Sequence, residues 1–156
     1  MGAGKTSVGR RLAKNLGWKF IDLDEEIERT EGRAIADIFQ EHGEIHFRQL
    51  ERLYLQRISS SDKSVIALGG GAFLDPENRA LAENTGLTVW LKASFAKVVA
   101  RVKIDGTRPK FISSEQAEAL YQSREPYYAM AKIHVSTDDG TPETVAAEIL
   151  GVVRKS

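Results

Sequence analysis

The glycine-rich segment Gly2-Ala3-Gly4-Lys5-Thr6 limits what this chain can fold into more than any other feature. It matches the second half of the pattern G-x-x-x-x-G-K-[ST], in which a loop leads into a helix. Glycines let backbone N–H groups turn towards an anion, and the start of the helix adds its positive dipole. The segment therefore predicts a phosphate-binding loop. The alternative is an ordinary glycine-rich turn before a helix. It stays open because the first glycine of the pattern is absent.

Two side chains of this segment have defined tasks in a nucleotide site. Lys5 is expected to contact the β- and γ-phosphates of ATP, and the hydroxyl of Thr6 is expected to bind Mg²⁺. The residues expected to surround the phosphates are Gly2, Ala3, Gly4, Lys5, Thr6 and Ser7.

Hydrophobic periodicity predicts helices and strands in alternation along the rest of the chain. Gly43 separates two of the helices, and Pro126 is expected to kink or break another. Residues 104–113 are polar and are expected to form a mobile loop. The predicted helices are 6–16, 25–30, 34–41, 44–58, 76–84, 94–102, 114–131 and 142–153, and the predicted strands are 19–23, 64–68, 87–91 and 133–137.

Strands that alternate with helices predict an α/β fold, a parallel sheet of the P-loop NTPase type with helices on both faces. The length predicts a single domain over residues 1–156. A phosphate-binding loop normally follows a buried strand, yet nothing precedes Met1. We therefore expect the functional protein to begin upstream, with a central strand before the loop. Without that strand, we expect four strands with a gap or an open edge at the middle of the sheet.

Composition excludes several classes of function. The 22 basic and 22 acidic side chains give a formal net charge of zero, so no global field marks a nucleic-acid or membrane partner. The absence of cysteine excludes disulfides, thiolate metal sites and a cysteine nucleophile. No apolar run approaches the ~20 residues that a membrane-spanning helix needs. We expect a cytoplasmic protein.

Two aspartates stand at the end of the first predicted strand. Asp22 and Asp24 are two residues apart, so strand alternation places both on one face, at the edge where ligands bind in open α/β sheets. Beside a phosphate-binding loop, Mg²⁺ needs a carboxylate and a hydroxyl nucleophile needs a proton acceptor. The alternative is a helix cap beside a solvated acid.

Two further patterns favour a ligand site. Arg48 and Glu51 lie three residues apart on a predicted helix, either as an exposed pair or as a guanidinium held ready for bidentate recognition of a carboxylate. Gly69, Gly70 and Gly71 follow an apolar strand. Three consecutive glycines cost considerable backbone entropy, and a ligand that approaches the main chain explains them better than a plain turn does.

In this order and spacing, these features resemble the shikimate kinase family over essentially the whole chain. Members of that family transfer the γ-phosphate of ATP to the 3-hydroxyl of shikimate, in the pathway to chorismate and the aromatic amino acids. The matching motifs are Asp22-Leu23-Asp24, Gly43-Glu44, Phe47-Arg48-x-x-Glu51 with Leu55, Val65-Ile66-Ala67-x-Gly69-Gly70-Gly71-x-Phe73, Thr107-Arg108-Pro109 and Arg124-Glu125-Pro126-x-Tyr128.

The resemblance implies a role for each matching residue. The arginines would bind the carboxylate of shikimate, while Asp24 and the glycine backbone would bind its hydroxyls. Residues 32–60 would form the substrate-binding helices. Asp22 would join Thr6 near the metal, and Asp24 would orient the attacking hydroxyl. The implied substrate-binding residues are Asp24, Arg48, Gly69, Gly70, Gly71 and Arg124.

On the nucleotide side, the resemblance implies that Arg108 belongs to a closing lid and neutralises charge on the transferring phosphate together with Lys5. The segment 138–142 would border the adenine. The catalytic set is thus Lys5, Asp24 and Arg108, and the further nucleotide-binding candidates are Arg101, Arg108 and Pro142.

Two alternatives stay open. A gluconate-type sugar-acid kinase shares the phosphate-binding loop and an anionic polyol substrate, although Arg48, Glu51 and the three glycines argue against it. A non-catalytic binding protein on a degenerate kinase fold is the other. The incomplete phosphate-binding loop supports it, and the retained Lys5, Asp24 and Arg108 oppose it. The expected partners are ATP and shikimate with Mg²⁺, without nucleic acid or membrane, and the expected state is a monomer.

Overall fold

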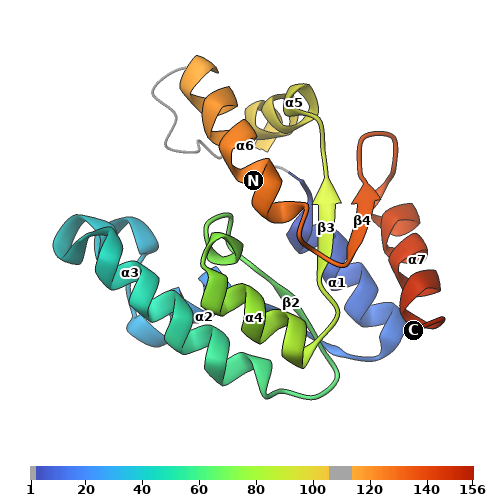
Figure 1. Ribbon diagram of the computed structural model, residues 1–156, viewed down its shortest axis with the longest axis horizontal. Coiled ribbons are helices and arrows are strands. Elements are labelled where there is room, and N and C mark those ends of the chain that lie inside the picture. The colour runs from blue at the N-terminus through green and yellow to red at the C-terminus, as the bar shows by residue number, and fades with distance from the viewer. Residues whose placement is uncertain (1–2, 106–113) are drawn as a thin grey trace. The chain divides into compact units, whose positions relative to one another are not determined.

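The computed structural model describes residues 3–105 and 114–156, and the chain divides into two compact units (Figure 1). The central unit is Ala13–Gly86, and the terminal unit joins Met1–Leu12 to Leu87–Ser156. Helix α1 (Lys5–Leu16) begins in the terminal unit and ends in the central one.

In the central unit, two parallel strands alternate with helices (Figure 1). Strand β1 pairs with β2 in a register that runs from Lys19 opposite Ser64 to Asp22 opposite Ala67. The helix α4 packs along α3, and the short turn η1 packs against both. The elements are β1 (Lys19–Asp22), α2 (Leu23–Glu31), α3 (Ile35–Ser59), β2 (Ser64–Ala67), η1 (Ala72–Leu74) and α4 (Pro76–Thr85).

The core of the central unit comes from the apolar faces of α2 and α3. Leu23 and Ile27 stand one helical turn apart on α2 and are both fully buried, which is the spacing of an amphipathic helix. Leu23 was expected to end the strand, but it begins α2, because Asp22 caps the helix there. The buried cluster consists of Leu23, Ile27, Ile38, Phe47, Tyr54, Leu55, Ile58 and Ala72.

Helix α3 is interrupted at Gly43, as the sequence predicted. Gly43 has φ 81° and ψ 175°, a conformation outside the helical region that is open essentially to glycine alone. The two segments on either side of Gly43 are therefore distinct helices in their backbone geometry, although they follow one another without a loop.

In the terminal unit, β3 pairs with β4 in parallel, with Val89 opposite Ile133. Helix α6 continues through Pro126 and ends at Tyr128 rather than at the expected residue 131. Pro126 therefore does not break the helix where it stands, and the kink that was expected as the alternative stays a prediction. Helix α5 extends to Asp105, past the expected start of the loop at 104, and residues 106–113 of that predicted loop lie outside the described residues. The elements besides α1 are β3 (Val89–Lys92), α5 (Phe95–Asp105), α6 (Ser114–Tyr128), β4 (Ile133–Ser136) and α7 (Pro142–Val153).

The four predicted strands are thus all present, and they form two separate pairs. Within residues 3–105 and 114–156, β1 bonds to β2 and β3 bonds to β4, but no ladder joins β2 to β3. This is the interruption between the second and third strands that the sequence predicted.

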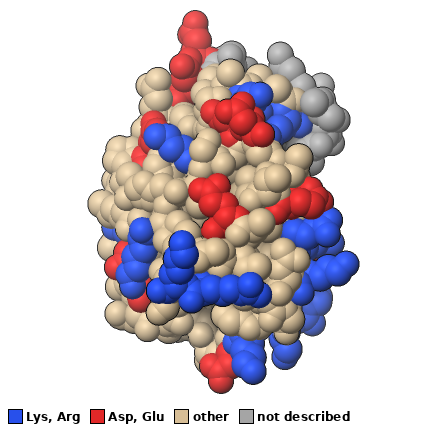
Figure 2. Space-filling model, turned by 90° about the vertical axis from the view of Figure 1, so that its right-hand side faces the viewer, with Lys and Arg blue, Asp and Glu red and all other residues tan. Residues whose placement is uncertain are grey.

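The surface carries both signs of charge. Figure 2 shows one face on which both basic and acidic side chains are exposed. Neither sign covers the whole of that face, in keeping with a formal net charge of zero. Among the helices described, none is both long and apolar enough to cross a membrane.

Candidate functional site

The cap of helix α2 places Asp24. Asp22 ends β1 in an extended conformation, and its Oδ1 accepts the backbone N–H groups of Asp24 (3.0 Å) and Glu25 (3.2 Å). Asp24 therefore lies in the first turn of α2, where the helix dipole favours negative charge. The capping alternative for Asp22 is confirmed. Metal binding by Asp22 remains a prediction.

The loop formed by Gly69, Gly70 and Gly71, called the glycine loop below, packs directly against Asp24. A Cβ atom at Gly69 would lie only 2.7 Å from Oδ1 and 3.0 Å from Oδ2 of Asp24, and the first distance is shorter than a Cβ atom normally comes to another atom. The absence of a side chain at Gly69 thus lets the carboxylate rest on the backbone of the loop. The structure brings these two predicted site residues together.

Arg48 is held on the same loop by two carboxylates. Its Nη1 donates to Glu51 Oε1 at 2.9 Å, and its Nη2 donates to Glu44 Oε1 at 3.3 Å. A Cβ atom at Gly71 would overlap the guanidinium. The partnership with Glu51 was predicted as one of two alternatives. The role of Glu44 was missed, although its position four residues before Arg48 on a helix is the spacing that brings side chains together.

Burial shapes the charges of this pair. Glu51 is only 1% exposed, and this burial raises the pKa of Glu51, while the guanidinium of Arg48 opposes the rise. Burial would lower the pKa of Arg48, but the hydrogen bonds and charges of Glu51 and Glu44 outweigh it, so its pKa is raised. We regard both side chains as ionised, because a guanidinium keeps its proton and pairs with a carboxylate 2.9 Å away.

The structure adds a reason for two of the three glycines. The protein's own carboxylate and guanidinium lie against Gly69 and Gly71, and ligand binding by the backbone of the loop stays a prediction. The carboxylate of Asp24 and the guanidinium of Arg48 therefore meet the loop at two glycines that stand two residues apart. Such an arrangement can accept a proton or hydrogen bond from a hydroxyl and can bind a carboxylate with the fork of a guanidinium.

In the terminal unit, the glycine-rich segment leads into α1 as predicted. Gly4 has φ 85°, and its carbonyl accepts the N–H of Val8 at 2.9 Å as the first bond of the helix. Lys5 and Thr6 therefore occupy the first turn of α1, where backbone N–H groups point away from the helix. This is the geometry of an anion site at a helix start. Gly2 lies outside the described residues.

Arg101 is placed beside the segment that was expected to border the adenine. Its Nη2 donates to the carbonyl of Thr137 at 2.6 Å, and its Nη1 donates to Oγ1 of Thr137 at 3.1 Å. Asp138 in turn accepts the N–H of Ser94 at 2.8 Å. Pro142 begins α7 directly after the cap Thr141. The structure thus brings Arg101 next to the start of residues 138–142.

Arg124 has an unsatisfied polar atom. It lies half-buried in α6, and its Nε is buried without a hydrogen-bond partner among the described residues. A buried N–H donor without a partner is costly, so this guanidinium is suited to an anion. Arg108 falls outside the described residues, and its role stays a prediction.

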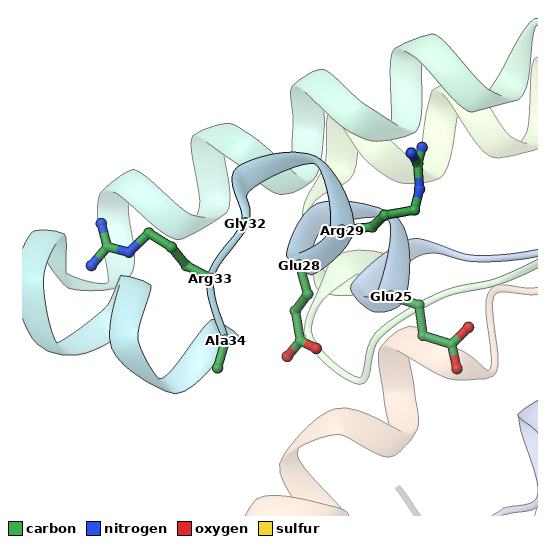
Figure 3. A pocket seen from close by; sticks show the side chains of 6 residues that line it. All are labelled: Glu25, Glu28, Arg29, Gly32, Arg33 and Ala34. Carbon is green, nitrogen blue, oxygen red and sulfur yellow. The ribbon is translucent and has the colours of Figure 1, made fainter.

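A shallow groove elsewhere in the central unit does not compete with these residues. Figure 3 shows that the side chains of Glu25, Arg29 and Arg33 along the groove point in different directions rather than towards one centre. Arg29 pairs with Glu26 at 2.6 Å, and Arg33 pairs with Glu41 at 2.5 Å. The two arginines of the groove are therefore engaged with carboxylates outside it.

Comparison with known proteins gives a consistent result. A family model described as shikimate kinase matches residues 1–154. A shikimate kinase of Persephonella marina is 39% identical, with 99% of this chain and 94% of that protein covered. One of Caulobacter vibrioides is 44% identical, with coverages of 100% and 80%. The solved shikimate kinase of Acinetobacter baumannii in complex with shikimate is 36% identical and superposes with a TM-score of 0.92 over 99% of this chain and 89% of that one.

Proposed function

The chain belongs to the shikimate kinase family, and on that premise we propose that it transfers the γ-phosphate of ATP to the 3-hydroxyl of shikimate. One observation supports the proposal most directly. Asp24 and Arg48 lie against Gly69 and Gly71 of the same loop. A proton acceptor and a carboxylate-binding fork are thereby held close together, as a small ring that bears both hydroxyls and a carboxylate requires.

Asp24 is the proposed acceptor in the chemical step. The ring hydroxyl oxygen attacks the γ-phosphorus, the bond between that phosphorus and the β–γ bridging oxygen breaks, and ADP leaves. The hydroxyl proton passes to the carboxylate of Asp24. The cap from Asp22 and the backbone at Gly69 hold this carboxylate in place, so little reorganisation is needed at the moment of transfer.

Arg48 and Arg124 are the proposed ligands of the shikimate carboxylate. Arg48 enters binding with its guanidinium already oriented by Glu51 and Glu44, which lowers the entropy lost on association. Arg124 carries the buried Nε without a described partner, and a carboxylate would satisfy it. The backbone of Gly69, Gly70 and Gly71 is proposed to bind the ring hydroxyls.

The glycine-rich segment is proposed to hold the nucleotide. Residues Ala3 to Ser7, with Gly2, would surround the phosphates, and Lys5 would neutralise charge on the transferring group. Arg101 and Pro142 are proposed to contact the nucleotide base, and Arg108 is proposed to share the charge of the transferring phosphate with Lys5.

The donor set of the chain fits Mg²⁺. The hydroxyl of Thr6 and the carboxylate of Asp22 are oxygen ligands, which Mg²⁺ prefers, and this ion usually takes one or two of them together with phosphates and waters. The described residues contain no group of three or more His, Cys, Asp or Glu that could hold a metal. When bound, Mg²⁺ would neutralise negative charge between the β- and γ-phosphates.

A substrate panel tests the function. ADP release should be rapid with shikimate and Mg²⁺, and the product should be shikimate 3-phosphate by phosphorus NMR. ADP release with gluconate in place of shikimate would indicate a sugar-acid kinase instead. No ADP release with either acid, at concentrations that bind, would favour a non-catalytic binding protein. We further propose that the enzyme acts as a monomer in the cytoplasm, whose reducing conditions suit a chain without cysteine.

A further inference from the structure

The turn η1 follows the glycine loop, and each of its three carbonyl groups accepts a hydrogen bond from a side chain of helix α4. Nδ2 of Asn78 donates to the carbonyl of Ala72 at 3.0 Å. Nη1 of Arg79 donates to the carbonyls of Phe73 at 2.9 Å and Leu74 at 2.7 Å. Asn78 is only 1% exposed, so the first of these bonds is buried. The position of η1 therefore follows the position of the start of α4.

The start of α4 is in turn fixed to helix α3 by an ion pair. Nη2 of Arg52 donates to Oδ2 of Asp75 at 2.6 Å, and Nη1 of Arg52 lies 3.3 Å from Oε2 of Glu77. The other oxygen of Asp75 caps α4 by accepting the N–H groups of Glu77 at 2.8 Å and Asn78 at 3.4 Å. One carboxylate thus joins the helix cap to α3.

Partial burial would raise the pKa of Asp75, but the guanidinium of Arg52 and the two capping N–H groups outweigh it and hold that pKa below its ordinary value. Asp75 is therefore fully ionised at neutral pH, and its side chain is only 18% exposed. An ion pair that also serves as a helix cap constrains two elements with one group.

Arg48 and Arg52 stand four residues apart on α3 and so lie on one face of that helix. Arg48 lies against Gly71, at the start of the turn, and Arg52 holds Asp75, at its end. The stretch from Gly71 to Asp75 is therefore held along a single turn of α3 by two successive arginines. A shift of Asp75 along α3 would change how closely Gly71 meets Arg48.

We propose that Arg52 and Asp75 are positioning residues, which set the fit between the glycine loop and Arg48 and thereby the affinity for the acidic ring substrate. Neither residue contacts the substrate. Arg52 acts through Asp75, α4 and η1 on the loop, and the nucleotide is unaffected. The inference rests on the proposed function for the identity of the substrate.

The first test measures both Michaelis constants in the full-length chain. Arg52→Ala should raise the KM for shikimate about fivefold, as expected for one partly exposed ion pair, with kcat within about twofold and the KM for ATP unchanged. Asp75→Asn keeps an oxygen that can cap α4 but loses the charge, so it should give the same pattern. The double variant should be no worse than either single variant, because both remove one interaction. Arg52→Lys should recover part of the affinity.

The control is Arg29→Ala, which removes the exposed pair with Glu26 in the same unit and should leave both constants unchanged. An unchanged KM for shikimate in Arg52→Ala would overturn the inference. Equal increases in both constants, with a fall in the thermal midpoint, would also overturn it, since they would show a general loss of stability.

Hydrogen exchange separates this inference from the proposed function. The amides of residues 69–74 should exchange faster in Arg52→Ala than in the unaltered protein, whatever acid the enzyme phosphorylates. Failure of the unaltered protein to phosphorylate shikimate, with faster exchange in the variant, would refute the substrate and keep the positioning role. Normal phosphorylation with unchanged exchange would refute the positioning role alone.

Discussion

The two units of the molecule hold their candidate functional side chains in different ways. In the central unit, Asp24 and Arg48 are fixed by other side chains and by a loop without side chains of its own. In the terminal unit, the described features are mainly those of the backbone. Gly4 turns the chain into α1 at φ 85°, and Arg101 donates to the carbonyl of Thr137.

This contrast reflects the two proposed ligands. A small ring alcohol has a single charge, so its site must be arranged in advance if binding is to orient the ring. A nucleotide brings several negative charges, and backbone N–H groups at a helix start already favour these. Substitutions that change a single group are therefore expected to affect function more in the central unit than on the nucleotide side.

The largest effect is expected for Asp24→Asn. The amide keeps the shape of the side chain but can no longer take a proton, so kcat should fall about 10²–10⁴-fold, the usual contribution of a general base. The thermal midpoint and the KM for ATP should change little. Glu25→Gln, one residue along the same helical turn, is the matched control. Near-normal turnover of Asp24→Asn would remove this residue from the chemical step.

Arg124→Ala tests whether the contrast follows the boundary between the units. Arg124 belongs to the terminal unit, yet it is proposed to bind the shikimate carboxylate. Its loss should weaken shikimate binding by about 2–5 kcal/mol, the range for a buried charged contact. Isothermal titration with each ligand measures this. A comparable loss of ATP affinity would show that Arg124 binds the nucleotide. Each unit would then supply residues for one ligand only.

Gly71→Ala should sharpen the contrast by adding one methyl group to the loop. That group would overlap the guanidinium of Arg48, and the strain should cost about 1–3 kcal/mol. We expect this strain to raise the KM for shikimate and to leave the KM for ATP unchanged. Gly86→Ala is the control, since its Cβ would meet only the carbonyl of Ala82 at 3.8 Å. Equal behaviour of the two variants would show that the loop adjusts freely.

The sequence predicted the positions of these features better than their causes. The break at Gly43, the acid at the start of α2 and the special character of Gly69 to Gly71 all follow from local backbone preferences, which single residues reveal. That Gly69 and Gly71 accommodate Asp24 and Arg48 depends on contacts between distant segments. Local patterns carry no information about such contacts.

The turn η1 was not predicted at all. Its three residues are too few for any periodicity, and it is stabilised by Asn78 and Arg79, which lie in the next helix. Pro126 was expected to kink or break its helix, and α6 runs two residues beyond it before ending at Tyr128.

The smallest effect is expected for the stability of Asp75→Asn. The folded-state pKa of Asp75 is held below its usual 3.8. Its ionised form therefore stabilises the fold above that value, and this contribution is lost as the pH falls through the lower, folded-state pKa. The variant should be less stable by under about 1 kcal/mol at pH 7, and the difference should vanish once the pH is below the folded-state pKa of Asp75. Urea denaturation measures it. Glu26→Gln, in the exposed pair with Arg29, provides the comparison, and a pH-independent difference would exclude the ion pair as its cause.

Gly43 shows that glycine can be required for reasons of chirality alone. A Cβ at Gly43 would meet no atom within 4 Å, so space does not restrict the position, whereas φ 81° and ψ 175° do. The mirror image of these angles lies in the extended region that ordinary residues favour. In a chain assembled by chemical ligation, D-alanine would suit the backbone at position 43 where L-alanine would strain it. At Gly71, with φ −97°, the backbone suits an L-residue and only the guanidinium of Arg48 excludes it.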